Sequence, residues 1–502
     1  MVRAFARLSS TRGFDRRSSI AIGPAPRLLL GGCVALAAAL VGCSTHSPAT
    51  PPNLGFIETR FLQAAPEGAE ALDAITWRGF GDPALEDLIT QTRSANLDVR
   101  IAQQRVRQAR AGSMAAASRL MPTVSATAAV ADQRTGLPAE FKRTAPDIQA
   151  VRGGLDAGWE LDIFGAARAA ADAAELDALA ADAGVEVAQW LATTEVARQY
   201  IVWLGARLRL EQMRALLQAQ RDTERLTRSL EAGGLASRLD VARAVGEVNS
   251  LAAQLPPLET LVAVTEAQIK VLAGVSPGAA LPALNARAVP RLPTVPLLSP
   301  GQPIELLQRR PDLRVAERQL RAESARLRES EADQWPRLVL GAALGQQDLR
   351  VNGLNLAPVA YSNVALAFTA PVFNAGRLRA AVERQSARER VAVLQYERIV
   401  LGAMQDVENS LVALNQERER SARLAVLVES RRSGLMHAQS LYREGQIDQL
   451  QLLDAQRGLI AAELAATDSH AQRALGAVHL VKALGGGWYA TPPAALPTQQ
   501  RL

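Results

Sequence analysis

The chain has 502 residues, with 56 Lys or Arg against 50 Asp or Glu. Six of the Arg residues and one Asp lie within the first 42 positions, so the rest of the chain carries 50 basic and 49 acidic residues. This near-neutral balance excludes the strongly basic surface that nucleic-acid binding requires. The 4 His and 2 Cys show no metal-ligand spacing, and no glycine-rich phosphate loop follows a predicted strand. We therefore expect no catalytic site, no metal and no cofactor.

Residues 1–42 predict a secretory signal peptide, because Arg residues precede an apolar run, 28–40, that is too short to cross a bilayer. The sequence Leu40-Val41-Gly42-Cys43 resembles a bacterial lipobox. This resemblance implies that Cys43 is acylated and anchors the protein in lipid, and Ser44 after it favours the outer membrane. A plain signal peptide with an incidental cysteine is the alternative. Residues 43–75 contain several prolines and predict an extended N-terminal arm.

The rest of the chain contains two tandem copies of one unit. Asn96-Leu97-Asp98-Val99-Arg100 aligns with Arg310-Pro311-Asp312-Leu313-Arg314 at a spacing of 214 residues. Further on, Asp162-Ile163-Phe164-Gly165 aligns with Pro371-Val372-Phe373-Asn374 at a spacing of 209 residues. Such a nearly constant spacing indicates repeats that differ by short insertions. The predicted boundaries are a first repeat at 76–274, a linker at 275–300, a second repeat at 301–484 and a C-terminal tail at 485–502.

Each repeat begins with a helix and continues in two strands. The first helix is predicted from about Ala84 to Arg119, before Pro122. Apolar residues then alternate with polar or small ones in two segments per repeat, as a strand with two unlike faces requires. The apolar-side positions are Val124, Ala126, Ala128 and Val130, then Val151, Gly153, Leu155, Ala157, Trp159, Leu161 and Ile163, and in the second repeat Leu338, Leu340, Ala342 and Leu344, then Val364, Leu366, Phe368, Ala370 and Val372. Each repeat therefore predicts a β-hairpin.

These strands are long enough to cross the hydrocarbon layer of a membrane. Each is predicted to have about 11 to 14 residues, and a tilted membrane strand needs roughly 9–11. Trp159, Trp335, Tyr361 and Phe368 lie in or beside the strands, as residues of an interfacial belt do. The alternative is a half-buried sheet in a soluble domain, which shows the same alternation.

Each hairpin leads into a helix that is too long for a compact domain. The predicted helices have 68 residues from Gly165 and 71 from Asn374, without an internal proline. At about 1.5 Å per residue each would be roughly 100 Å long. Apolar residues recur along them in steps of three and four, for example Ala197, Ile201, Leu204 and Leu208, or Met404, Val407, Leu411 and Leu414. This spacing predicts a coiled-coil seam.

Both long helices are expected to turn back at glycines, Gly233-Gly234 and Gly445, because glycine adopts a left-handed backbone easily. The return helices are predicted at about 237–272, with an interruption at Pro256-Pro257, and at about 449–484. Each repeat thus ends in a long helical hairpin.

Four membrane strands per chain cannot close a barrel. Unpaired backbone groups in lipid cost several kcal/mol each, and small barrels need at least about eight strands. The chain must therefore oligomerise. Two, three or four chains would give 8, 12 or 16 strands, and strand arithmetic leaves these alternatives open.

Several of these features together resemble the TolC-like outer-membrane efflux factor family, and within it the lipid-anchored OprM and NodT branch. They are the lipobox, the tandem copies, the helix starts at Asp98 and Asp312, the strand exits around Phe164-Gly165 and Phe373-Asn374, and the glycine tips followed by Leu239-Asp240-Val241 and Leu453-Asp454-Ala455. The resemblance covers essentially the whole mature chain. It implies a homotrimer with a 12-stranded transmembrane β-barrel in the outer membrane, continued by a long α-helical coiled-coil barrel in the periplasm.

The same resemblance implies a passive exit duct of a tripartite efflux system that carries small molecules or drugs. Its partners would be a periplasmic adaptor and an inner-membrane pump of the resistance-nodulation-division type. By resemblance, the helical tips dock the adaptor, although a plain helix turn is the alternative. These tip residues are Gly233, Gly234, Leu235, Ala236, Ser237, Gly445, Gln446 and Ile447.

The family narrows its periplasmic mouth with acidic side chains just past the second tip. Asp454 matches one of them, while Gln451 stands where another is expected. A solvated helix-face carboxylate is the alternative for Asp454. Asp240 and Tyr442 match members of the family's polar lock between hairpins, but Ile447 occupies the place of its usual Arg, so this lock departs from the pattern.

Two other functions fit the same sequence. The first is the outer-membrane duct of a type I protein secretion system. The second is a structural periplasmic coiled-coil lipoprotein that spaces the envelope layers, with the sheets as soluble caps. A wide duct selects little, so we expect the pump to choose the cargo.

Overall fold

The computed structural model describes residues 52–63, 70–71, 77–142, 144–285, 290–295 and 298–486. All of these belong to one unit, which spans Ala49–Leu502. The predicted signal peptide, the lipid-anchor residue Cys43, most of the arm at 43–75 and nearly all of the tail at 485–502 lie outside the described residues.

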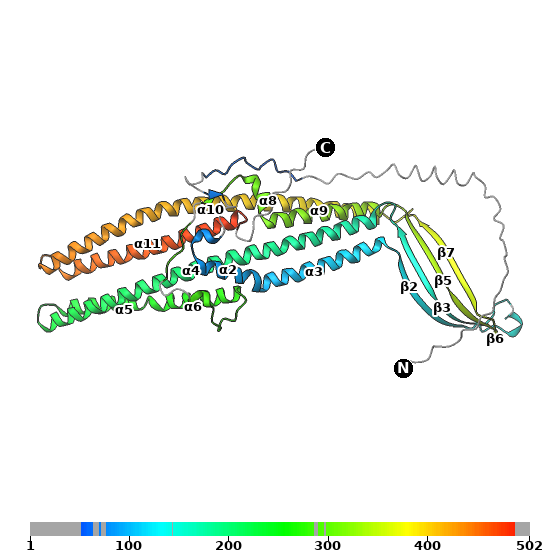
Figure 1. The fold of residues 1–502 in the computed structure, drawn as a ribbon, viewed down its shortest axis with the longest axis horizontal. Coiled ribbons are helices and arrows are strands. Elements are labelled where there is room, and N and C mark those ends of the chain that lie inside the picture. The colour runs from blue at the N-terminus through cyan, green and yellow to red at the C-terminus, as the bar shows by residue number, and fades with distance from the viewer. Residues whose placement is uncertain are drawn as a thin grey trace. The chain divides into compact units, whose positions relative to one another are not determined.

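The two predicted repeats have the same order of elements (Figure 1). The first contains α2 (Pro83–Ala95), α3 (Leu97–Ala117), β2 (Thr123–Gln133), β3 (Ile148–Leu161), α4 (Ala166–Ala232), α5 (Arg238–Ala252) and α6 (Leu255–Leu272). The second contains α8 (Leu306–Arg309), α9 (Pro311–Ala332), β5 (Arg337–Val351), β6 (Leu354–Asn355), β7 (Val359–Thr369), α10 (Arg377–Arg443) and α11 (Gln449–Ala483). Shorter elements are β1 (Glu70–Ala71), η2 (Trp77–Phe80), η3 (Ser118–Leu120), η4 (Ala139–Phe141), α7 (Pro282–Asn285), β4 (Leu298–Ser299) and η5 (Pro303–Glu305).

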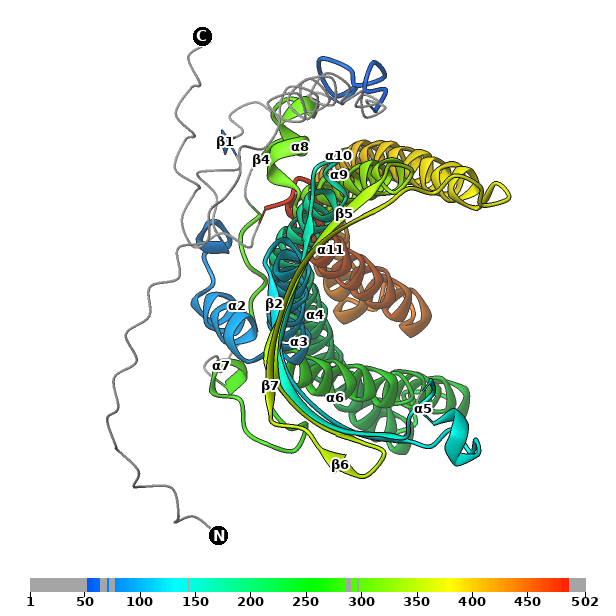
Figure 2. The same ribbon diagram turned by 90° about the vertical axis from the view of Figure 1, so that its right-hand side faces the viewer.

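The strands form one antiparallel sheet in the order β2-β3-β5-β7, with β6 paired to the end of β5. Both predicted hairpins are present, β2 with β3 and β5 with β7, and β3 pairs with β5 between the repeats. Figure 2 shows that the four strands curve together, so the sheet is curled. Ile163, Ala370 and Val372 were predicted as strand residues but follow the ends of β3 and β7. Pro371 cannot donate a ladder hydrogen bond, which accounts for the earlier end of β7.

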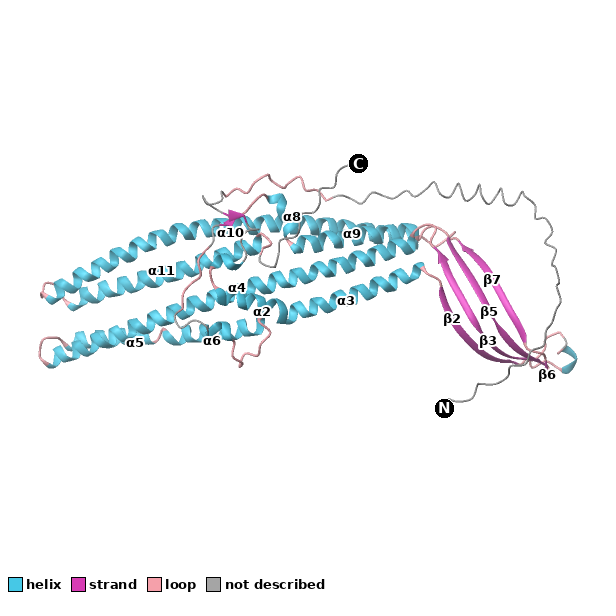
Figure 3. Ribbon diagram, viewed as in Figure 1, coloured by secondary structure: helices cyan, strands magenta, loops and turns pink. Residues whose placement is uncertain are grey.

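The helices follow the strands in the same lateral order. Figure 3 shows the strands together at one end of the helices. Along the helical layer α3 contacts α4, α4 contacts α9, and α9 contacts α10. Each strand of the sheet therefore continues into one helix of a matching row. Among the described residues, no helix combines the length and the apolar character that a bilayer span requires.

The two long helices, α4 and α10, have 67 residues each. The predicted start of α10 at Asn374 is three residues too early. Ala375 has a φ of 49° and Gly376 a φ of 84°, so the backbone turns left-handed before the helix begins. Gly165 has a φ of 82° at the equivalent place before α4.

The predicted seam is confirmed by burial of its residues. Ala197, Ile201 and Leu204 of α4 and Val407, Leu411 and Leu414 of α10 are buried. They belong to one hydrophobic core that α2 and α11 also enter. At Gly205 of α4 an added Cβ would lie 3.2 Å from the Cβ of Ala471 on α11, so small residues let these two helices approach closely.

The prediction of one helix from Ala84 to Arg119 is wrong. Asn96 has an extended ψ of 133° and separates α2 from α3. Its side-chain oxygen accepts hydrogen bonds from the N–H groups of Asp98 (2.9 Å) and Val99 (3.2 Å), and its Nδ2 donates to the carbonyl of Leu272 (2.9 Å). One amide thus caps the start of α3 and the end of α6.

The interruption of the first return helix comes slightly earlier than predicted. α5 ends at Ala252 and α6 begins at Leu255, so Pro256 lies in the first turn of α6. A proline is tolerated there because its missing N–H would have no partner within the helix. The second return helix, α11, is continuous, as predicted.

Candidate functional site

The two helical hairpins end in turns with the same backbone geometry. Gly234 and Gly445 both have a φ of 72°. The N–H of Leu235 donates to the carbonyl of Leu230 (2.8 Å), and the N–H of Gln446 donates to that of Leu441 (2.9 Å). This hydrogen bond and the left-handed glycine define a Schellman turn. The predicted turns are therefore confirmed.

The tip side chains point mainly to solvent. Leu235 is 79% exposed. The other tip residues are either exposed, as are Gly233, Gly234, Ser237, Gly445 and Gln446, or half-buried, as are Ala236 and Ile447. Adaptor docking at these residues stays a prediction.

Asp240 forms a capping box at the start of α5. The N–H and hydroxyl of Ser237 donate to its carboxylate (3.0 and 2.7 Å), and its own N–H donates to the Ser237 hydroxyl (3.2 Å). These hydrogen bonds from Ser237 lower the pKa of Asp240 below its usual range. Tyr442 is half-buried on α10, and within the described residues no hydrogen bond joins it to Asp240. The structure thus places the two lock candidates apart within one chain.

Gln451 and Asp454 lie one turn apart on the exposed side of α11, while Leu452 and Leu453 are buried. The N–H of Gln451 donates to the side chain of Asp448, which caps this helix (2.8 Å). Both predicted constriction side chains are therefore free to face a pore. Their role there stays a prediction.

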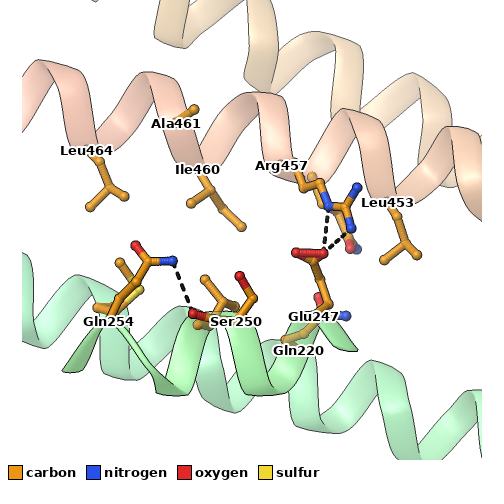
Figure 4. Close-up of a pocket in the computed structure, with 12 residues that line it drawn as sticks. Gln220, Glu247, Ser250, Gln254, Leu453, Arg457, Ile460, Ala461 and Leu464 are labelled. Atoms are coloured by element: carbon orange, nitrogen blue, oxygen red, sulfur yellow. Dashed lines mark hydrogen bonds and ion pairs between the residues drawn. The ribbon is translucent and has the colours of Figure 1, made fainter. Parts of the chain in front are cut away.

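Two contacts that the sequence analysis missed join the two helical hairpins, and Figure 4 shows the first of them, between Arg457 and Glu247. Arg457 of α11 forms an ion pair with Glu247 of α5, with Nε donating at 2.7 Å. Nearer the tips, Nε2 of Gln449 donates to the hydroxyl of Thr227 on α4 (2.7 Å). Glu247 and Arg457 are 210 residues apart, which is close to the repeat spacing. Opposite charges at nearly matching positions of the two repeats were a signal that could have identified them.

The interface beside this ion pair is loosely packed. A cavity of about 230 Å³ lies between α4, α5 and α11. It is lined by Met213, Gln220, Glu247, Ser250, Leu251, Gln254, Leu453, Gln456, Arg457, Ile460, Ala461 and Leu464. Close-packed cores resist movement, whereas an interface with a cavity has fewer contacts to break. The two hairpins therefore make fewer contacts here than a close-packed interface would.

The sheet has one apolar face and one polar face. The strand register aligns Ala126, Leu155 and Leu344 across three strands, and the alternating pattern follows from it. The apolar face carries Val124, Val130, Val151, Leu155, Trp159, Leu338, Leu340, Leu344, Val364, Leu366 and Phe368, of which Val130 is 81% and Phe368 68% exposed. The polar face carries Thr123, Ser125, Thr127, Arg152, Asp156, Glu160, Arg337, Gln347, Tyr361 and Asn363.

In the part of β3 and β5 from Gly154 to Asp156 and from Leu344 to Gln347, the polar face is the more shielded of the two. Along β3 and β5 its residues Gly154, Asp156, Gly345 and Gln347 are half-buried, whereas Leu155 and Leu344 on the apolar face are exposed. Side chains crowd on the concave side of a curled sheet and spread on its convex side. The sheet can thus separate an apolar phase outside from water inside.

Comparison with known proteins identifies the chain. The family model described as outer membrane efflux protein matches residues 88–275 and 303–486. The pyoverdine export outer membrane protein OpmQ of Pseudomonas putida is 31% identical over 470 residues, which cover 91% of this chain and 97% of OpmQ. Nodulation protein T of Rhizobium leguminosarum bv. trifolii is 29% identical over 447 residues, which cover 86% of this chain and 90% of that protein.

The structure agrees with this sequence similarity. The solved outer-membrane channel OprN superposes with a TM-score of 0.76 at 30% identity, and the match covers 89% of this chain and 99% of OprN. The resemblance to the TolC-like outer-membrane efflux factors is confirmed by these matches. The chain belongs to the outer membrane efflux protein family.

Proposed function

We propose that this protein is the outer-membrane exit duct of a tripartite efflux system, a passive conduit for small molecules or drugs. A periplasmic adaptor and an inner-membrane pump of the resistance-nodulation-division type supply the cargo. The observation that carries the proposal is the curled sheet, which is apolar on one face, polar on the other and open at both edges. Relatives named for export of pyoverdine, toluene and organic solvents support the efflux assignment.

The open edges favour a closed ring of chains. β2 pairs only with β3 and β7 only with β5 among the described strands. The alternating order makes β2 and β7 antiparallel to each other, and both have 11 residues. β7 of one chain can therefore form an antiparallel ladder with β2 of the next chain. Three chains give a 12-stranded barrel, the homotrimer that we propose.

The layer of helices also ends in two uncovered helices, α3 on the side of β2 and α10 on the side of β7. α3 carries exposed apolar side chains at Leu97 (60%), Ile101 (49%) and Met114 (68%). α10 carries Val391 (51%), Leu394 (64%) and Leu401 (50%). Exposed large apolar side chains on both flanks favour an interface there. In the proposed ring α10 of one chain packs against α3 of the next, which continues the barrel into the periplasm.

A deletion strain tests the cargo class. We expect deletion of the gene to increase accumulation of drugs or dyes in cells and to leave secreted proteins unchanged, with restoration by the intact gene. Loss of a secreted protein without drug sensitivity would instead identify a protein-secretion duct.

Asp454 is proposed to narrow the periplasmic mouth, one carboxylate from each chain. Replacement Asp454→Ala should raise the single-channel conductance in planar bilayers and reduce the preference for cations, because the ring loses both bulk and negative charge. Glu463, also on α11, lies 3.1 Å from Arg432 of α10 and is the control, since Glu463→Ala removes a carboxylate that is paired within one hairpin. Unchanged conductance and cation preference in Asp454→Ala would show that Asp454 is not part of the constriction.

Cys43 is proposed to carry the lipid anchor. The Cys43→Ala protein should lose labelling by a fatty-acid analogue and still require detergent for extraction, because the proposed barrel holds it in the outer membrane. Release of this variant by mild salt would show that the lipid alone binds the membrane, as the spacer-lipoprotein alternative requires.

A further inference from the structure

One cation on the polar face of the sheet has no neutralising carboxylate. Arg337 lies 2.8 Å from Asp333 and 3.9 Å from Glu160. Arg152 forms no ion pair with any described residue, and its nearest cross-strand neighbours are Ala129 on β2 and Gln347 on β5. Its positive charge is therefore available to a ligand.

The nearest carboxylate along the same face of β3 is too distant to cancel this charge. Asp156 lies four residues away, a rise of about 13 Å along a strand. The screening length at physiological salt is about 8 Å. In the loop before β3, Asp147 is paired with Lys142, and this contact lowers the pKa of Asp147 to about 2. That carboxylate is already neutralised by its own partner.

Two contacts hold the Arg152 side chain in place. Its guanidinium lies 5.5 Å from the centre of the Tyr361 ring, and one nitrogen donates to Oε1 of Gln347 (3.2 Å). A cation above an aromatic ring gains about 0.5–1 kcal/mol at an exposed site. The remaining N–H groups of the guanidinium can still donate hydrogen bonds to a ligand. The two contacts therefore orient the side chain and leave donors for binding.

Two glycines, one on β3 and one on β5, leave the space that the Tyr361 ring occupies. A Cβ at Gly154 would lie 2.5 Å from the Tyr361 hydroxyl, and one at Gly345 would lie 2.8 Å from Cζ of Tyr361. Any other residue at these positions would displace the ring. The local sequence of β3 and β5 therefore supports a fixed pair of Tyr361 and Arg152.

We propose that Arg152, one from each chain, forms a ring inside the outer end of the duct that binds small multivalent anions such as phosphorylated or polycarboxylate molecules. Arg152 lies four residues after β3 begins, at the end of the sheet away from the helices. This inference rests on the proposed barrel, because the ring exists only when several chains share one lumen. Convergent guanidinium groups bind phosphate and carboxylate oxygens by charge-assisted hydrogen bonds.

Calorimetric titration of the detergent-purified oligomer with tripolyphosphate tests the site at constant salt. The wild-type protein should bind, and Arg152→Gln should weaken binding by about tenfold or more, as the loss of several charge-assisted hydrogen bonds predicts. The matched control is Arg350→Gln. Arg350 of β5 lies opposite Gln149, three residues from Arg152 along β3, and on the opposite face of the sheet, so its loss should leave binding within about twofold.

Tyr361→Ala provides a second variant that keeps the charge. It should weaken binding less than Arg152→Gln, because the guanidinium remains but loses its orienting contact. Absence of wild-type binding, or equal binding by wild type and Arg152→Gln, would overturn the anion site. An equal loss in Arg350→Gln would also overturn it, because net charge would then explain the result.

The same samples separate this inference from the proposed duct. Ion conductance and an oligomeric mass without tripolyphosphate binding would leave the duct standing and remove only the ring. A monomeric mass would overturn the proposed barrel, and the ring with it.

Discussion

Replacement of Arg310 by alanine should cost the protein about 3 kcal/mol of unfolding free energy, the lower end of the range for breaking a buried ion pair. Arg310 is 5% exposed and occupies the place in the second repeat that Asn96 has in the first. It lies between Asp312 (2.7 Å) and Asp406 (3.2 Å) and donates to the carbonyl of Ala483 at the end of α11 (3.1 Å). Its guanidinium also lies 5.2 Å from the Trp190 ring of α4.

Burial by itself lowers the pKa of the Arg310 guanidinium, but the hydrogen bonds and charges of Asp312 and Asp406 outweigh this effect and raise it. The arginine therefore remains charged and joins α9, α10, α11 and α4. Asp406 is 58% exposed at its side chain and regains water in the variant, which is why we take the lower end of the range.

Thermal loss of the helical circular dichroism signal measures this effect. The control is Arg321→Ala on the same helix, because Arg321 is 65% exposed and pairs only with Glu317 one turn away. That change should cost no more than about 0.5 kcal/mol. Equal unfolding midpoints for the two variants would contradict the role of Arg310 as the centre of the core.

The second large effect is expected at the ion pair between the hairpins. Glu247→Gln or Arg457→Gln should increase the open population of the periplasmic mouth. Arg457 is 53% exposed at its side chain and Glu247 16%, and a pair at the surface contributes up to about 1 kcal/mol, so three pairs in the proposed trimer contribute about 3 kcal/mol. A change of that size shifts an equilibrium on the order of 100-fold. Single-channel recording in planar bilayers should therefore show longer or more frequent openings.

A charge-reversal variant and a matched control test whether the attraction between α5 and α11 keeps the mouth closed. The double variant Glu247→Arg with Arg457→Glu should restore the closed population, because the attraction between α5 and α11 returns. Arg432→Gln removes the pair of Arg432 with Glu463 (3.1 Å), which joins α10 to α11 inside one hairpin. Its gating should match wild type. Openings in Arg432→Gln equal to those of Arg457→Gln would show that general helix loosening, and not release of the hairpins, controls the mouth.

The repeats, the strands and the helical hairpins were predictable from sequence because each depends on local periodicity. The glycines at 234 and 445 also marked their turns correctly. The predicted helix from Ala84 to Arg119 passed over the break at Asn96, although asparagine is a favoured residue for capping the start of a helix. Asn96 caps α3 through local hydrogen bonds, whereas its bond to the carbonyl of Leu272, 176 residues away in sequence, could not be read from a local pattern.

The contacts at the mouth were harder to predict for a similar reason. Asp240 was a lock candidate by resemblance, yet the structure uses its carboxylate to cap its own helix with Ser237. Glu247 and Arg457 belong to no local sequence motif, so nothing in the sequence singled them out. Only the packing of α11 against α4 and α5 brings them together, and that packing depends on distant small residues such as Gly205.

The central claim is that several chains share one barrel wall, since the outer edges of β2 and β7 have no partner among the described strands. The mass of the detergent-solubilised protein, determined by light scattering with the detergent contribution subtracted, tests it most directly. We predict the mass of three chains and a particle longer than about 100 Å in projection images, because α4 and α10 each extend about 100 Å at 1.5 Å per residue. A stable monomer in buffer without detergent or lipid would contradict the account.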